Sequence, residues 1–125
     1  MKKDNKGFSL VELIIVIAIM AVLIGILAPQ YLKYVNRSRI STDLTNAEEV
    51  ATAVSAAIAD GDLKAVDSPL DNAAIIAKTQ ITRLEDSKVT GATAWEVTFT
   101  ADGITTITLG GEQIYPTPTS TWDLD

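Results

Sequence analysis

Residues 8–28 read FSLVELIIVIAIMAVLIGILA and contain a single charged side chain, Glu12. A helix of this length extends about 31 Å, which matches a bilayer core of about 30 Å. An ionised carboxylate inside a membrane span costs roughly 2.5–3.5 kcal/mol, so it requires a partner. Cleavage after Gly7 would create an amine on Phe8, a cation close enough in sequence to fill that role. The stretch therefore predicts a membrane-spanning helix. Its single carboxylate is predicted to have a function beyond membrane anchoring.

Two simpler interpretations of this stretch fit less well. A conventional secretory signal needs small residues at the end of the apolar run, but Ile26 occupies one of those positions and Pro29 follows the run directly. A plain signal anchor fits the length and leaves Glu12 unexplained. The flanking cations are equally numerous on both sides of the stretch, so they do not decide its orientation.

Length and composition limit what the remainder can form. The chain has 125 residues and neither cysteine nor histidine, which excludes disulfide bonds and zinc sites with Cys or His ligands. The residues after Gly61 are sufficient for only a small core. The C-terminal tail, which is rich in Pro, Thr and Ser and has Trp122 as its one large side chain, must therefore be fixed by packing.

Charge is unevenly distributed along the chain. Residues 1–39 contain six Lys or Arg against two acids, whereas residues 40–125 contain four Lys or Arg against fourteen acids, a net charge of −10. An acidic surface repels phosphate backbones, so no direct nucleic-acid binding is expected. We interpret the acidity as a means of keeping this part of the chain soluble.

An amphipathic pattern continues the helix beyond the apolar stretch to about Ala59. Its apolar positions recur at steps of three and four residues and form one stripe: Ile40, Leu44, Ala47, Val50 or Ala51, Val54 and Ile58. Polar residues are predicted on the other faces: Thr42, Asp43, Asn46, Glu48 and Glu49. The segment Asp60-Gly61-Asp62 is expected to end the helix.

A second, shorter helix is predicted after Gly61. Ser68 has the character of an N-cap, Pro69 of a first helical residue and Asp71 of a capping-box acid. The helix is expected to run to Lys78, with Leu84 as the alternative end. Its predicted buried residues are Ile75, Ile76 and Ile81.

Three strands are predicted in the last third of the chain. Residues 95–100 alternate apolar and polar side chains, residues 104–109 follow, and residues 113–115 form a short third strand after a Gly110-Gly111 turn. A three-residue loop with Gly103 in a left-handed conformation is expected between the first two, because it pairs Val97 with Ile107 and Trp95 with Leu109.

The start of the apolar stretch carries a family resemblance. Lys6-Gly7-Phe8-Ser9-Leu10-Val11-Glu12-Leu13 resembles the class III signal of type IV pilins and of the related pseudopilins. Pro29-Gln30-Tyr31 and Tyr34-Val35-Asn36-Arg37-Ser38 are similar to the second half of the pilin N-terminal helix. The likeness ends near Gly61. It implies, together with the patterns above, an α+β, pilin-like fold: a long N-terminal α-helix packed on a small antiparallel β-sheet of about three strands, with one extra helix.

The resemblance also implies an organisation and a function. Residues 1–7 would be a leader peptide, 8–32 a transmembrane and filament-core segment, 33–60 the amphipathic half of the helix, and 61–125 a small β-rich domain. A prepilin peptidase would cut after Gly7 and methylate Phe8. An assembly ATPase and a platform protein would then move the subunit from the cytoplasmic membrane into a homo-oligomeric helical filament at the cell surface, used for adhesion or motility. Glu12 would meet the Phe8 amine of an incoming subunit.

The same resemblance gives Gly25 and Pro29 a possible role. Pro29 removes the hydrogen bond to the Gly25 carbonyl, and glycine costs about 1 kcal/mol of helix propensity, so one turn carries both defects. We interpret this segment as helical in the membrane and extended in the filament. The alternative is that both residues are incidental, since membrane helices tolerate them.

Two other functions remain open at this point. A pseudopilin of a type II secretion or competence machine would share every N-terminal feature, whereas a static membrane-anchored binding domain would keep its leader and would not self-associate. An enzyme is not expected, because nucleophile–base sets other than Ser–Lys pairs need His or Cys, and no phosphate-binding loop is present. No cofactor or metal is expected either. The aspartates at 60, 62, 67 and 71 are interpreted as a solvated surface rather than a calcium loop, since Lys64 interrupts them.

Overall fold

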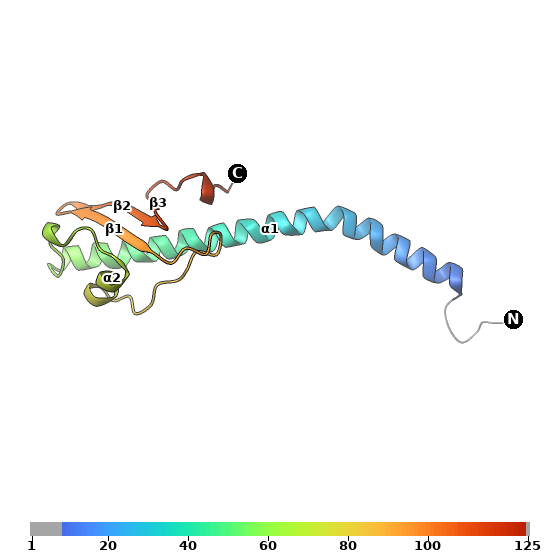
Figure 1. Ribbon diagram of the computed structural model, residues 1–125, viewed down its shortest axis with the longest axis horizontal. Helices are drawn as coiled ribbons and strands as arrows, with labels where there is room; N and C mark the ends of the chain where they lie inside the picture. Colours follow the sequence, from blue (N-terminus) through green and yellow to red (C-terminus); the bar gives the residue numbers. More distant parts are fainter. Residues whose placement is uncertain (1–8, 125) are drawn as a thin grey trace. The chain divides into compact units, whose positions relative to one another are not determined.

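The computed structural model describes residues 9–124, so the predicted leader, Gly7, Phe8 and Asp125 lie outside the described residues. The predicted α+β, pilin-like layout is confirmed: a long helix precedes one short α-helix and a three-stranded sheet (Figure 1). In chain order the elements are α1 (Leu10–Ala59), the 3-10 helix η1 (Ala65–Asp67), α2 (Asn72–Lys78), β1 (Trp95–Thr100), β2 (Gly103–Leu109), β3 (Glu112–Tyr115) and the 3-10 helix η2 (Ser120–Trp122). The chain divides after Asn36 into two compact units, and α1 passes through both.

The C-terminal half of α1 packs against the sheet through the predicted stripe. Its buried apolar residues recur at helical spacing: Ile40, Ala47, Val50, Ala51, Val54 and Ala57. Leu44 and Ile58 are half-buried at the margins of the same stripe. One prediction about this helix is wrong, however, because Asp43 lies on the buried face and not on an exposed one.

The sheet is antiparallel with strand order β1-β2-β3. The predicted pairing of Trp95 with Leu109 and of Val97 with Ile107 is confirmed. The predicted loop length is wrong, because Thr100 already pairs with Gly103 and only two residues form the turn. A β-bulge compensates: Phe99 pairs with Ile104 whereas Thr98 pairs with Thr106. The extra residue therefore lies within β2 instead of in the loop, and the buried side chains of both strands stay on the core face.

Two glycines permit the hairpin turns. Gly103 has φ 142° where β2 begins, a backbone conformation that L side chains rarely adopt. Gly110 has φ 67° in the predicted Gly110-Gly111 turn, and a Cβ placed there would lie 2.6 Å from the Cβ of Ala92. Both the backbone angle and the close approach of the loop at Ala92 therefore require glycine at position 110.

The start of α2 differs from the prediction. Its N-cap is Asp71, whose Oδ1 accepts a hydrogen bond from the Ala74 N–H at 2.9 Å. The preceding residues pair with the edge of β1 instead: Leu70 exchanges two backbone hydrogen bonds with Val97, and the Ser68 hydroxyl accepts one from Phe99. Tertiary strand pairing thus overrides the local start signal at Ser68, and the helix begins later.

The end of α2 and its buried residues are partly as predicted. The helix ends at Lys78, Ile75 is fully buried and Ile81 is half-buried against the core. Ile76 is 42% exposed, so its predicted burial is wrong. Since α2 has only two turns, one residue of the Ile75-Ile76 pair faces the core and its neighbour points about 100° away around the axis.

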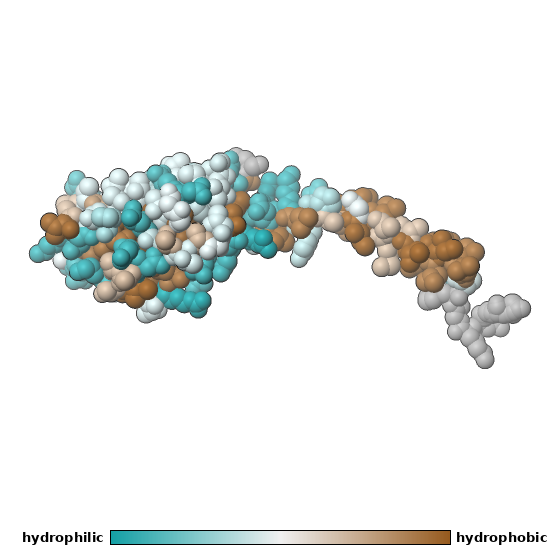
Figure 2. Space-filling view, in the orientation of Figure 1, coloured by the Kyte–Doolittle hydropathy of each residue, from teal (hydrophilic) through white to brown (hydrophobic). Residues whose placement is uncertain are grey.

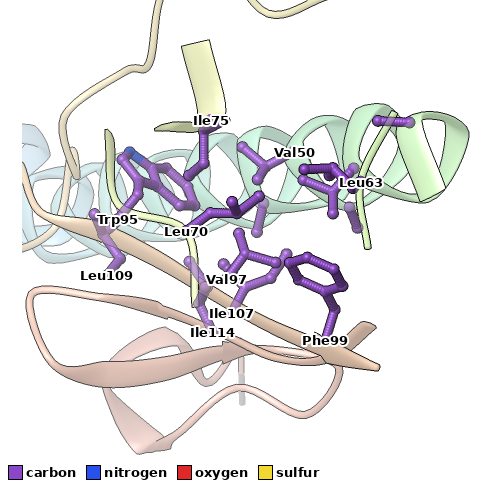
Figure 3. Close-up of a cluster of buried hydrophobic side chains, with 14 of the residues drawn as sticks. Val50, Leu63, Leu70, Ile75, Trp95, Val97, Phe99, Ile107, Leu109 and Ile114 are labelled. Carbon is purple, nitrogen blue, oxygen red and sulfur yellow. The ribbon is translucent and has the colours of Figure 1, made fainter. Parts of the chain in front are cut away.

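One core joins the helix, the sheet and the segment before α2. Figure 3 shows Trp95, Leu70 and Ile75 on one side of this core and Val97, Ile107 and Phe99 between β1 and α1. The indole N–H of Trp95 donates to the carbonyl oxygen of Glu85 at 2.9 Å, so its one polar atom is satisfied while the ring is buried.

Candidate functional site

The first turn of α1 places Glu12 at the edge of the apolar stretch. The backbone N–H of Glu12 donates to the Ser9 hydroxyl oxygen at 3.2 Å, and that of Leu13 donates to the Ser9 carbonyl oxygen at 3.1 Å. Ser9 therefore caps the helix start, a role that the Ser-x-x-Glu spacing could have indicated and that the sequence reading did not assign. The cap defines the first turn of the helix, and Glu12 lies in that turn.

The Glu12 carboxylate forms no ion pair with any other residue between 9 and 124. Its neighbours on α1 are large, exposed and apolar, with Val11 64% and Leu13 49% exposed. The predicted partner, the amine of Phe8, lies outside the described residues, as does the predicted cleavage position Gly7. The described part of the chain thus supplies no counter-charge for Glu12, and pairing with a second subunit stays a prediction.

The N-terminal part of α1 exposes an unbroken apolar surface. It contains an 18-residue window of mean hydropathy 3.1, none of it buried, which is long and apolar enough to cross a membrane. Figure 2 shows hydrophobic side chains gathered at this end of α1 and more hydrophilic ones further along the helix. An exposed apolar surface of this size requires a lipid or protein environment.

The Gly25–Pro29 turn is helical in the described chain. α1 continues through Pro29 without interruption. A Cβ built on Gly25 meets nothing within 4 Å, so no contact inside the described chain requires glycine there. The proposed extension of this turn on assembly stays a prediction.

A buried carboxylate that the sequence reading did not find lies on the second half of α1. Asp43 is 1% exposed and accepts four hydrogen bonds. Its donors are the Ser87 hydroxyl at 2.6 Å, the backbone N–H of Lys88 at 2.7 Å and of Val89 at 3.3 Å, and the Trp122 indole N–H at 2.9 Å. Several hydrogen bonds to a buried carboxylate offset the free energy lost when it is removed from water.

These hydrogen bonds connect three segments that are distant in sequence: α1, the loop before β1 and the C-terminal tail. Trp122 is 1% exposed, so the predicted packing of the tail is accompanied by a polar contact that had not been predicted. Glu112 on β3 adds a second attachment, because its Oε1 accepts a hydrogen bond from the Thr121 hydroxyl at 2.6 Å. The position of Asp43 between Ile40 and Ala47 was the available signal, since it lies on the apolar stripe.

Two of the four aspartates considered for calcium binding accept local backbone hydrogen bonds. Asp67 accepts a hydrogen bond from the Lys64 backbone N–H at 2.9 Å, and Asp71 caps α2. Between residues 9 and 124 no group of three Asp or Glu side chains is arranged to hold a metal ion.

Comparison with known proteins places these features in a family context. The model of the prokaryotic N-terminal methylation motif matches residues 2–28. The chain is 41% identical over 61 residues to the type IV major fimbrial protein FimA of Dichelobacter nodosus, which covers 49% of this chain and 39% of that protein. It is 34% identical over 102 residues to a fimbrial protein of Pseudomonas aeruginosa, covering 81% of this chain and 64% of that protein. No solved structure matches the chain.

The motif and the fold together define the class: a protein with a prokaryotic N-terminal methylation motif and a pilin-like α+β fold. Within this class, the resemblance to type IV pilins is confirmed by relatives that are named a type IV major fimbrial protein and a fimbrial protein. The chain spans less than two thirds of the length of these relatives.

Proposed function

We propose that this protein is a type IV pilin that is cleaved after Gly7, methylated on Phe8 and polymerised into a helical filament at the cell surface. The observation that carries the proposal is the methylation motif in residues 2–28, together with an exposed apolar helix whose carboxylate, Glu12, has no ion-pair partner between residues 9 and 124. Before assembly the helix spans the cytoplasmic membrane once. Adhesion and motility are the functions such a filament would serve, and no catalytic role is proposed.

The two halves of α1 have different functions in this proposal, because one is apolar and the other is amphipathic. The apolar segment, residues 8–32, is soluble in lipid as a single helix and becomes the packed core of the filament after assembly. Residues 33–60 hold the folded domain, residues 61–125, at the end of that helix. A prepilin peptidase, an assembly ATPase and a platform protein are the implied partners. The Phe8 amine of an incoming subunit would supply the counter-charge that Glu12 lacks among the described residues.

The first prediction concerns processing. In sheared surface filaments, the N-terminal peptide of this chain is expected to begin with N-methylated Phe8, as measured by mass spectrometry. Gly7→Val places a branched side chain at the cleavage position and is expected to leave the leader attached. A mature protein that still began at Phe8 in the Gly7→Val variant would contradict cleavage that depends on Gly7.

The sheared surface fraction also distinguishes a pilin from the two alternatives, a pseudopilin and a static membrane-anchored binding domain. Long filaments composed mainly of this chain indicate a pilin, whereas a pseudopilin would be processed in the same way without forming long surface fibres. A static membrane-anchored binding domain would retain residues 1–7 and remain monomeric.

The second prediction concerns the filament core. Because Pro29 lacks an N–H donor and glycine at position 25 lowers helix propensity, this turn of the exposed helix is weakened twice. A filament map is expected to show non-helical density between residues 21 and 29. Continuous helical density through that window would show that Pro29 only bends the helix.

A further inference from the structure

A groove runs along an exposed face of α1 and reaches the C-terminal end of α2. It has a volume of about 830 Å³, and both of its walls lie within residues 37–125. Small side chains line much of it, including Thr52, Ala53 and Ala56 on α1 and Ala77 beside Lys78. Since the approach of two helices is limited by the side chains at their contact, this groove can accept another helix at close range.

The groove is strongly acidic. Four carboxylates line it, those of Glu48, Glu49, Asp60 and Asp62, against the single ammonium group of Lys78. None of these five residues forms an ion pair with another residue between 9 and 124. Four like charges around one groove repel each other, so a cationic occupant is favoured over a neutral or anionic one.

The same chain carries a matching cationic stretch. Lys33 and Arg37 lie one turn apart on the same face of α1; both are exposed, and neither forms an ion pair with another described residue. Arginine is well suited to such contacts because its planar guanidinium group binds carboxylates with two parallel hydrogen bonds.

These two surfaces are too far apart to pair within one subunit. α1 is continuous from Leu10 to Ala59, so Arg37 lies about 16 Å along the helix axis from Glu48. Unpaired charges of opposite sign at separate places on one helix can meet only when a second copy is displaced along the axis.

We propose that the acidic groove receives the cationic stretch of α1 from a second copy of this chain. The two surfaces differ, so the contact is head-to-tail and does not close on itself, which is the arrangement that produces an open helical polymer. This inference rests on the proposed function and adds the surfaces that would determine how subunits bind outside the membrane-spanning segment. The contact is ionic and partly exposed, so it is expected to weaken with salt.

Charge reversal tests the proposed contact. The double variant Glu48→Lys/Glu49→Lys is expected to lower the yield of sheared filaments about tenfold, since like charges across an interface are strongly unfavourable. A matched control, Glu96→Lys/Asp102→Lys, makes the same change in net charge at exposed positions of the β1–β2 hairpin and is expected to leave the yield unchanged. Adding Lys33→Glu/Arg37→Glu to the groove variant restores the attraction and is expected to recover the yield.

Cross-linking gives a direct readout of proximity. The chain has no cysteine, so Asn36→Cys beside the cationic stretch and Thr52→Cys in the groove introduce unique thiols at exposed positions without changing any charge. In filaments that carry both cysteines, a short bismaleimide is expected to link the thiol at position 36 of one subunit to the thiol at position 52 of its neighbour. The double variant would then give a ladder of covalent multimers, and each single variant no more than dimers.

The outcomes separate this inference from the function on which it rests. If the unmodified chain forms no filaments, the proposed function fails. If filaments form but show no ladder, and the charge-reversed groove is tolerated as well as the hairpin control, docking in the groove is overturned while the filament proposal stands. A loss of yield that the compensating Lys33→Glu/Arg37→Glu changes do not recover also counts against the contact.

Discussion

Replacing Glu12 with leucine is expected to leave membrane insertion intact and to abolish filaments. The substitution removes the only charge of the apolar stretch, so the segment becomes easier to place in lipid. It also removes the carboxylate that is proposed to bind the Phe8 amine of an incoming subunit. Apolar side chains pack in many axial registers, whereas an ion pair in a low-dielectric environment selects one.

This prediction is tested by measuring, for the same variant, the amount of protein in the membrane and the yield of sheared filaments. Glu12→Leu is expected to accumulate in the membrane, lose its leader normally and give at least about tenfold less sheared filament. Glu12→Asp keeps the charge on a shorter side chain and is expected to be intermediate. A normal filament yield from Glu12→Leu would show that the carboxylate does not direct assembly.

Ser9→Ala is the matched control for the helix start. It removes the hydroxyl that caps the first turn, at a cost of about 1 kcal/mol, and leaves the charge of Glu12 unchanged. Filament yield is expected to remain close to that of the parent. If Ser9→Ala instead reproduced the loss seen with Glu12→Leu, the position of the helix start would be the important property of this turn.

Replacing Asp43 with asparagine is expected to destabilise the folded domain by about 3 kcal/mol or more. The amide keeps the shape of the carboxylate but loses its charge and one acceptor. Its NH₂ group faces the Lys88 N–H if it replaces Oδ1, and the donors of Ser87 and Trp122 if it replaces Oδ2. Hydrogen bonds to a charged group contribute about 1.5–3 kcal/mol each, and a buried donor left without a partner costs a similar amount. The loss would be a large fraction of the free energy of unfolding of a small domain.

Urea unfolding of the full chain in detergent micelles measures this effect. Trp95 and Trp122 are both buried, so their fluorescence reports the loss of the folded domain. Asp102→Asn, the same chemical change in an exposed turn, is expected to alter the free energy of unfolding by less than about 0.5 kcal/mol. Equal unfolding midpoints for the Asp43 and Asp102 variants would contradict a stabilising role of the buried carboxylate.

A double-mutant cycle isolates the attachment of the tail. Trp122→Phe keeps a buried ring and removes the indole donor, so it is expected to cost less than Asp43→Asn. Combined with Asp43→Asn it should cost less than the sum of the two single changes, because Trp122→Phe removes the hydrogen bond that Asp43→Asn weakens. Strict additivity would mean that the Asp43–Trp122 contact adds nothing of its own.

The sequence predicted those elements whose signals are local. The unbroken apolar stretch and the three-to-four spacing that follows it predicted both halves of α1, because helical periodicity depends only on the order of residues in one segment. The strand register was also predictable, since a slip by one residue would expose Val97 and Ile107. The methylation motif, which lies within one contiguous stretch, gave the candidate assembly residues.

Only the tertiary structure decided the features that depend on distant partners. Ser68 and Pro69 have the local signals of a helix start, but Ser68 and Leu70 bind β1, which becomes available only when the sheet has formed. Asp43 appears in the sequence as one more acid on an acidic helix. It can be buried because donors from the loop at 87–89 and from Trp122 reach it together, and the free energy of burying a charge depends on those partners, not on the residues beside it in the chain.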